Sequence, residues 1–317
     1  MNTALVQHQT FTGASVRGAA HVQNSKPNQD ALFAANIGAW TLIAVADGHG
    51  GSPHFRSDRG SRMAVQAAQL AFQEFSDHGT TGLDDAALLQ ARTMLLPAQL
   101  LRHWRSLVDA DLIENPLNEG DISQDYLPYG STCALAAFSD GLTLLAQIGD
   151  GDIVVFSDDG ILERPLPDDR GLSGEQTRSL CQPDAARYFR TSLFVRPHPL
   201  SQSPFALAAT DGLAKSYGDP TNFLKIARHW QAIVAAQGMQ AASAHLENWL
   251  AKVNLTGNGD DLTVVMFAKA NLSVISRSKG SDINPGFNLF GLIKKFYLET
   301  IAAIFGCSLI YYLFFKN

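Results

Sequence analysis

The stretch Trp40-Thr41-Leu42-Ile43-Ala44-Val45-Ala46-Asp47-Gly48-His49-Gly50-Gly51 runs from an apolar segment directly into an acidic, glycine-rich phrase. Segment 40–46 is almost wholly apolar, which is typical of a strand buried on both faces. The apolar segment 205–209 likewise ends at Thr210-Asp211-Gly212, and Asp260 precedes the apolar segment 262–268. If these segments are neighbouring strands, their carboxylates gather at one edge, where a bound cation would offset their repulsion.

The rest of the chain alternates between groups of short strands and groups of long helices. A meander of antiparallel strands is expected at 132–138, 142–148 and 153–156, because turns containing Asp-Gly separate these segments. Helical patterns occupy 60–75, 85–108, 222–237 and 239–253. Strands and helices that come in separate groups predict an α+β layered domain rather than a βαβ repeat.

Composition bounds the class of protein. The chain has 317 residues, of which 46% are hydrophobic, so it has room for one large domain, or for one domain and an appendage. A net charge of -6 gives no basic footprint, so we expect no nucleic-acid partner. Cys133, Cys181 and Cys307 have no close spacing, which favours reduced structural thiols in a cytoplasmic setting. The first ten residues lack the basic and apolar regions of a secretory signal.

The last part of the chain differs in composition from the rest. We predict a catalytic domain over 1–270, a linker over 271–295 and a single transmembrane anchor over 296–316. Residues 297–315 are apolar apart from Glu299 and a few small polar groups, and as a helix they would extend about 28 Å. Basic residues are more numerous before this segment than after it, which places the domain in the cytoplasm. An amphipathic helix packed on the domain is the alternative.

The candidate ligands at the acidic phrases are all oxygen donors. Carboxylates and backbone carbonyls, without paired Cys or clustered His, select Mg²⁺ or Mn²⁺ over zinc or copper. Two such ions a few ångströms apart can share a deprotonated water and hold the oxygens of a phosphoryl group. The sequence therefore predicts a metal-dependent hydrolase that acts on phosphate esters.

Six phrases resemble, in order, those of the metal-dependent Ser/Thr protein phosphatases of type 2C, and the resemblance spans 11–268. They are Asn28-Gln29-Asp30, Ala46-Asp47-Gly48-His49-Gly50-Gly51, Gly130-Ser131-Thr132, Ile148-Gly149-Asp150-Gly151-Asp152, Ala209-Thr210-Asp211-Gly212-Leu213 and Asp260-Asp261-Leu262-Thr263-Val264-Val265. The resemblance implies a four-layer α-β-β-α sandwich of two antiparallel sheets flanked by helices. It also implies a centre of two Mn²⁺ or Mg²⁺ ions, with a third, more labile ion beside them.

The resemblance implies a role for each matching residue. Asp47 would bridge both metals and is counted as catalytic. His49 would donate a proton to the leaving seryl or threonyl oxygen, which suits the near-neutral pKa of imidazole. The implied metal ligands are Asp30, Asp47, Gly48, Asp150, Asp211 and Asp260, with Gly48 acting through its carbonyl and Asp150 holding the third ion.

At several positions the chain differs from the common family pattern, and these differences resemble those of a bacterial branch of the family. Gln29 stands where many relatives have Glu, so one negative charge is missing, and Ser25 stands where a phosphate-gripping Arg is common. Arg17 or Lys26 are candidates to supply that cation, but neither aligns with the Arg position. Asp261 replaces a common Asn and is not counted among the ligands.

The leading hypothesis is hydrolysis of phosphoserine and phosphothreonine in proteins by a water that bridges two Mn²⁺ or Mg²⁺ ions. The phosphoprotein substrates would be those of an opposing Ser/Thr kinase, near the membrane that holds the C-terminal helix. One alternative is a pseudophosphatase that binds phosphoproteins or metal without turnover. The other is a phosphatase of small molecules on the same fold.

Overall fold

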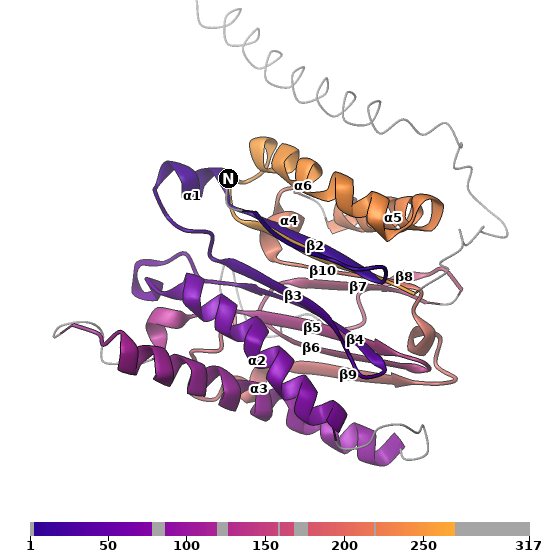
Figure 1. The fold of residues 1–317 in the computed structure, drawn as a ribbon, viewed down its shortest axis with the longest axis horizontal. Helices are drawn as coiled ribbons and strands as arrows, with labels where there is room; N and C mark the ends of the chain where they lie inside the picture. The colour runs from indigo at the N-terminus through magenta and orange to yellow at the C-terminus, as the bar shows by residue number, and fades with distance from the viewer. Residues whose placement is uncertain are drawn as a thin grey trace, which may run out of the picture. The chain divides into compact units, whose positions relative to one another are not determined.

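The computed structural model describes residues 3–77, 86–118, 126–157, 159–167, 177–218 and 220–269, with the backbone alone at 3–7, 220 and 221. Two antiparallel sheets face each other, and a pair of helices covers the outer face of each (Figure 1). The α+β sandwich predicted from the sequence is therefore confirmed. Among the described residues, no helix has both the length and the apolar character to cross a bilayer. The predicted linker and anchor, and Cys307, lie outside the described residues.

The first sheet has six strands and the second has five, and every adjacent pair is antiparallel. The first sheet has the order β1 (Thr3–Gln7), β2 (Phe11–Val16), β11 (Leu262–Ala268), β10 (Phe205–Ala209), β7 (Asp152–Phe156) and β8 (Leu162–Glu163). The second has the order β3 (Asp30–Ile37), β4 (Trp40–Asp47), β5 (Cys133–Ser139), β6 (Leu142–Ile148) and β9 (Arg190–Val195).

Long helices form the two outer layers. Helices α2 (Ser57–Asp77) and α3 (Ala86–Glu114) cover the second sheet, and α5 (Pro220–Gln237) and α6 (Met239–Thr256) cover the first (Figure 1). Two short helices, α1 (Ala19–Gln23) and α4 (Asp211–Lys215), lie beside the ends of strands. Single 3₁₀ turns are η1 (Ser52–His54), η2 (Leu127–Tyr129), η3 (Ala185–Tyr188) and η4 (Pro199–Gln202).

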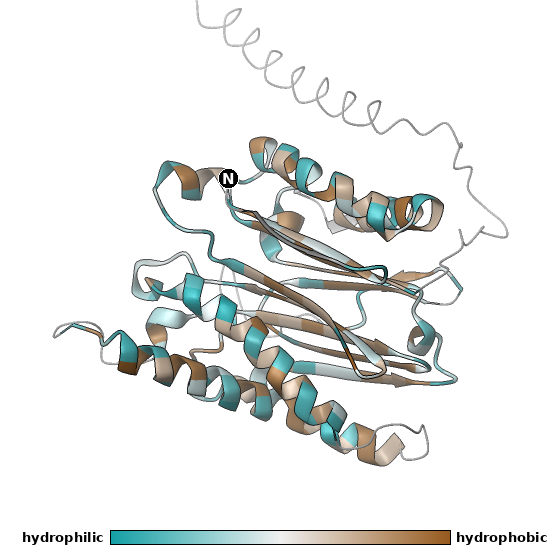
Figure 2. Cartoon of the chain, viewed as in Figure 1, coloured by the Kyte–Doolittle hydropathy of each residue, from teal (hydrophilic) through white to brown (hydrophobic). Residues whose placement is uncertain are grey.

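Strand β4 explains why apolar runs without alternation form this core. Leu42 and Ala44 pack with residues of α2 and α3, whereas Ile43 and Val45 point the other way and pack with the first sheet. Successive side chains of a strand face opposite sides, so a strand between a helix layer and a second sheet needs apolar residues throughout. Figure 2 shows this as hydrophobic colouring along most strands. The prediction of a strand buried on both faces is confirmed.

One part of the predicted topology is wrong. Strands β5 and β6 pair as expected, but β7 does not continue their meander and pairs instead with β10 in the other sheet. The chain crosses between sheets at Gly149, whose φ of 93° is accessible mainly to glycine. The amide of Gln147 bonds to the carbonyls of Gly149 and Gly151 and holds this crossing. Turn signals give the place of a reversal but not the sheet that the next strand joins.

Candidate functional site

The first two predicted ligands, Asp30 and Asp47, lie opposite each other at the same end of two paired strands. Asp30 begins β3 and Asp47 ends β4, and the antiparallel register pairs these two residues directly. The Asp47 backbone N–H donates to Thr132 Oγ1 at 3.0 Å, and its carbonyl accepts from Thr132 N at 2.8 Å and from Ser131 Oγ at 3.0 Å. The hydroxyls of Ser131 and Thr132 thus bind the backbone of Asp47.

The other sheet brings its acidic residues to the same place. Asp211 follows β10 as the first residue of α4, and Asp260 lies just before β11, the neighbour of β10. Thr210 Oγ1 donates to Asp30 Oδ2 at 2.7 Å, so the ends of strands from the two sheets are bonded to each other. Asp150 lies in the crossing between β6 and β7, where its Oδ1 accepts from Thr177 Oγ1 at 3.0 Å.

Electrostatic interactions link five carboxylates at this place, which we call the carboxylate edge: Asp30, Asp47, Asp150, Asp211 and Asp260. Loss of hydration raises the pKa of Asp47 well above its usual range, and the charges of Asp30, Asp211 and Asp260 raise it further. Burial also raises the pKa of Asp30, with additional repulsion from Asp261 and Asp260. The pKa of Asp150 is raised by loss of hydration and then by Asp211. Neighbouring carboxylates therefore disfavour the charged forms of Asp30, Asp47 and Asp150.

Divalent cations fit the donor chemistry of this edge. Asp211 is buried, and no hydrogen-bond donor among the described residues reaches its Oδ1. A buried carboxylate oxygen without a partner is costly unless a cation or another donor binds it. Carboxylate oxygens are the ligands that Mn²⁺ and Mg²⁺ prefer. The residues present therefore match the oxygen-liganded ions that the sequence predicts.

The side chains as they stand are turned toward partners within the protein. In the described part of the chain, no group of three or more His, Cys, Asp and Glu is arranged to hold a metal ion. Asp211 Oδ2 is paired with Lys215 Nζ, and Asp260 Oδ1 accepts from the backbone N–H of Asp261 at 2.9 Å. Burial opposes the charge of Lys215, but Asp211 raises its pKa. Lys215 therefore acts as an internal counter-charge at the carboxylate edge.

The glycine-rich phrase after Asp47 is closely packed. A Cβ at Gly48 would lie 2.5 Å from Ser57 O and 2.7 Å from Gln29 O, so this position requires glycine. Gly48 N donates to Gln29 O at 3.0 Å, which ties the phrase to the residue before Asp30. The use of the Gly48 carbonyl as a ligand stays a prediction, as do the ligand roles of the five carboxylates.

His49 lies against a second histidine that the sequence analysis did not single out. Its ring centroid is 4.9 Å from that of His54 in an edge-to-face contact, and His54 Nδ1 lies 2.6 Å from Leu127 O. Burial lowers the pKa of His49 to about 4, the charge of His54 lowers it as well, and Asp150 opposes both. His49 is therefore a neutral imidazole at pH 7 in the metal-free molecule. The sequence signal that could have identified His54 is its position five residues after His49 in the same glycine-rich segment.

The two cations considered from the sequence differ in position. Lys26 Nζ donates to Gly50 O at 2.7 Å, so it lies on the loop that follows His49. Arg17 donates instead to the carbonyl of His21 at 3.0 Å, on helix α1. Gln29 lies next to the same loop, and its amide donates to Ser57 Oγ at 2.5 Å and to His49 O at 3.3 Å. Of the two cations, Lys26 is the one that contacts the glycine-rich phrase after Asp47.

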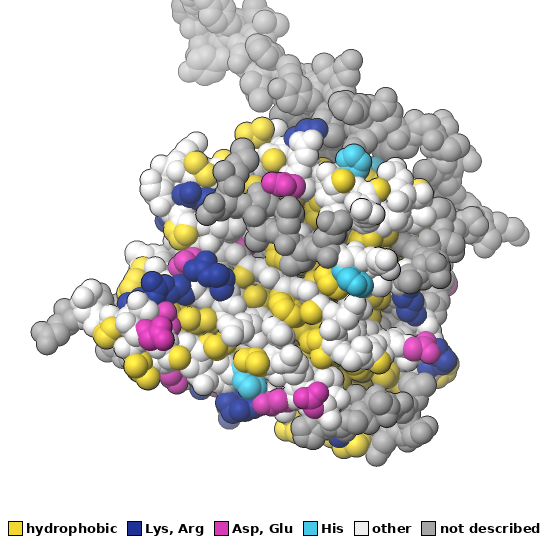
Figure 3. All heavy atoms as spheres, viewed as in Figure 1, with side chains coloured by type: hydrophobic (Ala, Val, Ile, Leu, Met, Phe, Trp, Pro, Cys, Tyr) yellow, Lys and Arg dark blue, Asp and Glu magenta, His cyan; other side chains and the backbone are white. Residues whose placement is uncertain are grey.

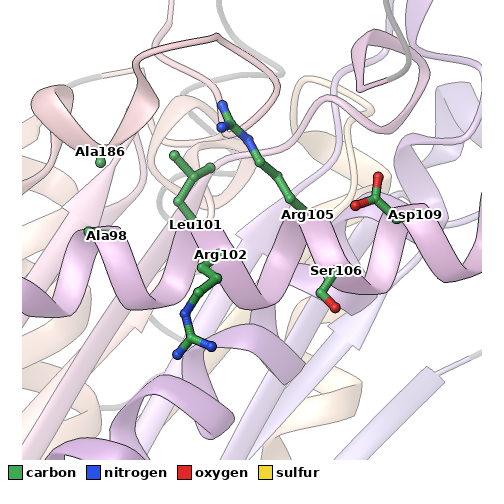
Figure 4. Close-up of a pocket in the computed structure, with 7 residues that line it drawn as sticks. All are labelled: Ala98, Leu101, Arg102, Arg105, Ser106, Asp109 and Ala186. Atoms are coloured by element: carbon green, nitrogen blue, oxygen red, sulfur yellow. The ribbon is translucent and has the colours of Figure 1, made fainter.

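A cavity of about 450 Å³ lies on helix α3, with one lining residue from the turn η3. It is lined by Ala98, Leu101, Arg102, Arg105, Ser106, Asp109 and Ala186, none of which is a predicted site residue (Figure 4). Arg102 binds both oxygens of Glu74 at 2.8 Å, and Arg105 donates to the carbonyls of Gln182 and Pro183. Figure 3 shows acidic and basic side chains interspersed on the visible face. The protein itself already binds these arginines, so the cavity does not compete with the carboxylate edge as a candidate site.

Comparisons with known proteins agree with this geometry. The family model described as protein phosphatase 2C matches residues 17–251. A bacterial serine phosphatase is 16% identical, with a TM-score of 0.52 over 86% of this chain and 100% of that chain. The phosphatase Stp1 from Staphylococcus aureus is 16% identical, with a TM-score of 0.51 over 84% of this chain and 97% of that chain. These two structures share the fold of the chain.

A third solved structure is the catalytic domain of the serine/threonine phosphatase PstP in complex with two manganese ions. It is 22% identical, with a TM-score of 0.49 over 84% of this chain and 99% of that chain. None of the curated proteins matches the chain significantly.

Proposed function

The chain belongs to the protein phosphatase 2C family, and we propose that it hydrolyses phosphoserine and phosphothreonine in proteins with two Mn²⁺ or Mg²⁺ ions at the carboxylate edge. The observation that carries this proposal is the convergence of Asp30, Asp47 and Asp211 from two sheets, where burial and then neighbouring carboxylates raise the pKa values of Asp30 and Asp47. Lys215 supplies a single positive charge against these carboxylates, so the remaining like charges would need cations from solution.

The metal-ligand roles proposed for each residue are those implied by the resemblance to type 2C phosphatases. Asp47 would bridge the two ions, with the Gly48 carbonyl on one and Asp211 and Asp260 on the other. Asp30 would bind directly or through water, and Asp150, the most exposed of the five, would hold a third and weaker ion. When bound, the ions would supply a water of lowered pKa and neutralise charge on the phosphoryl oxygens.

His49 and Lys26 would act on the substrate rather than on the ions. A neutral imidazole still carries one N–H, which can donate to the leaving oxygen or to a phosphoryl oxygen. A phosphate dianion bound beside it would raise the pKa of His49 from about 4 toward the range in which it can donate a proton. Lys26, at the carbonyl of Gly50, would supply positive charge to the phosphate.

The proposed location rests on the sequence alone. Residues 296–316 are apolar enough to anchor the chain by a single C-terminal pass, with the catalytic domain in the cytoplasm near its phosphoprotein substrates and the kinase it opposes. Flotation of the full chain with phospholipid vesicles tests the anchor. Recovery of all the protein in the unbound fraction would contradict it.

Phosphate release from a phosphopeptide in Mn²⁺ tests the function. Asp47→Asn and Asp211→Asn should each lower turnover by on the order of a thousandfold, the effect of removing one essential electrostatic group from an active site. Asp140→Asn is the matched control, because Asp140 lies in a surface turn with its side chain 87% exposed. Unchanged turnover in the Asp47 or Asp211 variant would refute the assignment.

Two other outcomes would favour the alternatives. Tight binding of Mn²⁺ without turnover of any phosphate ester would indicate a pseudophosphatase. Faster turnover of p-nitrophenyl phosphate and a sugar phosphate than of the phosphopeptide would indicate a small-molecule phosphatase. Each outcome leaves the fold assignment intact and changes only the chemistry at the edge.

A further inference from the structure

Asp261 is a buried carboxylate that binds two distant segments through their backbones. Its side chain is 2% exposed. Its Oδ1 accepts from Gly18 N at 2.6 Å, and its Oδ2 accepts from Gln29 N at 2.6 Å. Backbone N–H donors thus occupy both oxygens, and the residue serves as an anchor of the chain rather than as an open ligand.

His21 lies between this anchor and a predicted metal ligand. Its Nδ1 is 2.9 Å from Asp261 Oδ2, and its Nε2 is 3.5 Å from Asp260 Oδ1. The imidazole is almost fully buried, with its side chain 11% exposed. One ring therefore contacts two consecutive carboxylates, one turned into the protein and one at the carboxylate edge.

Backbone contacts hold the histidine in place. At the start of helix α1, which lies next to α6 in Figure 1, Ala20 N donates to Gly259 O at 2.9 Å and Ala19 N donates to Asn254 Oδ1 at 2.9 Å. These bonds satisfy N–H groups that a helix start otherwise leaves open. A Cβ at Gly18 would lie 2.4 Å from Gly259 O, so only glycine permits this close approach.

The arrangement links two ligands that come from different sheets. Gln29, whose N–H binds Asp261, directly precedes Asp30 at the start of β3. Asp261 itself directly follows Asp260, just before β11. A displacement of the Asp261 carboxylate would therefore move the backbone on both sides of the candidate metal centre.

We propose that His21 and Asp261 form a positioning pair that sets the spacing of Asp30 and Asp260 for cation binding. The inference rests on the proposed function, because it assigns the pair to the metal centre of that function. Neither residue touches substrate in this scheme. Residues that orient ligands from behind typically change metal affinity or activity by about 10- to 100-fold when they are replaced.

Calorimetric titration of the full chain with Mn²⁺ tests the pair, together with turnover of a phosphopeptide at increasing Mn²⁺. His21→Leu removes both contacts and should raise the Mn²⁺ dissociation constant about 10- to 100-fold. Saturating Mn²⁺ should restore most of the turnover, because the ligands themselves are intact. A purely structural role would lower the melting temperature in chelator without changing the dissociation constant.

Two amide variants separate the contacts of the ring. The amide N–H of His21→Asn can reach the position of Nδ1 and keep the contact with Asp261, whereas that of His21→Gln can reach the position of Nε2. The Asn variant should bind Mn²⁺ within a few-fold of the wild type, and the Gln variant should bind more weakly. If the Leu variant does not fold, the Mn²⁺ affinities of the Asn and Gln variants still test the positioning role of His21.

His103→Leu is the matched control, because His103 Nε2 lies 2.9 Å from Glu74 Oε1 on the helices α3 and α2. It removes a His–carboxylate pair without touching the carboxylate edge, so Mn²⁺ affinity should not change. Wild-type affinity in folded His21→Leu, or equal affinities in the Asn, Gln and wild-type proteins, would overturn the positioning pair alone. Absence of Mn²⁺ binding in the wild type would overturn the proposed function as well.

Discussion

Asp111 and Asp47 are both partly buried, yet their surroundings are opposite. Asp111, on α3, accepts from Arg59 Nη1 at 3.0 Å and from Tyr129 Oη at 2.5 Å. Burial alone would raise the pKa of Asp111, but Tyr129 and then Arg59 lower it below its ordinary value. At the carboxylate edge, burial and neighbouring carboxylates act in the same direction and raise the pKa of Asp47.

The two regions differ in whether their negative charges are balanced by positive charges within the protein. The network of Arg56, Arg59, Asp111 and Tyr129, which we call the arginine network, contains its own cations and stabilises the contact between α2, α3 and η2. The carboxylate edge has Lys215 close to Asp211 but still leaves several carboxylates repelling one another. The proposed function gives a reason for this cost, because an external cation would offset the repulsion, and such imbalance is typical of functional sites.

Added Mn²⁺ should give the largest change in stability, and it should act at the carboxylate edge rather than at the arginine network. At 100 times its dissociation constant, Mn²⁺ should stabilise the wild type by about 2.7 kcal/mol, because it binds the folded state and relieves repulsion. Thermal melts with Mn²⁺ and with chelator measure the shift. Asp111→Asn should keep the shift and Asp47→Asn should lose it. Equal shifts in both variants would show that the ions bind elsewhere.

Asp111→Asn should destabilise the arginine network and leave the carboxylate edge unchanged. Loss of the carboxylate leaves the partly buried guanidinium of Arg56 without its counter-charge, which should lower the free energy of unfolding by about 2–3 kcal/mol. Urea denaturation measures this loss, and phosphopeptide turnover in Mn²⁺ should remain within about twofold of wild type if the network is only structural. A large loss of turnover at unchanged stability would assign the arginine network a functional role.

The pH dependence of stability should differ between the two regions. Asp30 and Asp47 have raised pKa values when folded, so their contribution is fully present below the unfolded value of about 3.9 and is lost as pH rises through the folded values. Asp111 has a lowered pKa, so its contribution is present above about 3.9 and is lost as pH falls through the folded value.

Metal-free Asp47→Asn should therefore lose less stability than the wild type between pH 4 and pH 8, because one titrating carboxyl at the edge is gone. Urea denaturation in chelator across this range checks the slope. An identical slope in both proteins would mean that repulsion at the edge is weaker than the geometry indicates.

Lys215→Met should give the smallest effect. Lys215 is half exposed and pairs with Asp211, so its loss should destabilise the metal-free protein by no more than about 1 kcal/mol. Mn²⁺ should bind a few-fold more tightly, because no internal cation then competes for Asp211. Calorimetry measures both stoichiometry and affinity, and weaker binding would indicate that Lys215 supports the centre rather than competes with it.

Much of the fold followed from the sequence because its main signal is local. The unbroken apolar character of 40–46 predicted a strand between two layers, and Leu42 and Ile43 do pack on opposite sides. The sequence also predicted that Asp47, Asp211 and Asp260 lie close together, but as residues at the ends of neighbouring strands, whereas β4 belongs to one sheet and β10 and β11 belong to the other. The sheet joined by β7 was missed, because turn residues at Gly149 to Gly151 reverse the chain without choosing its partner.

The sequence by itself determined the most apolar strands, the acidic phrases beside them and the family resemblance, since these depend on residue types at fixed local spacing. Only the tertiary structure decided which carboxylates have hydrogen-bond donors within the protein and which repel one another. Asp261 shows the reason: its partners Gly18 and Gln29 lie 243 and 232 residues away along the chain. Whether a buried carboxylate is anchored or open depends on the donors that folding brings to it, and no local pattern contains that information.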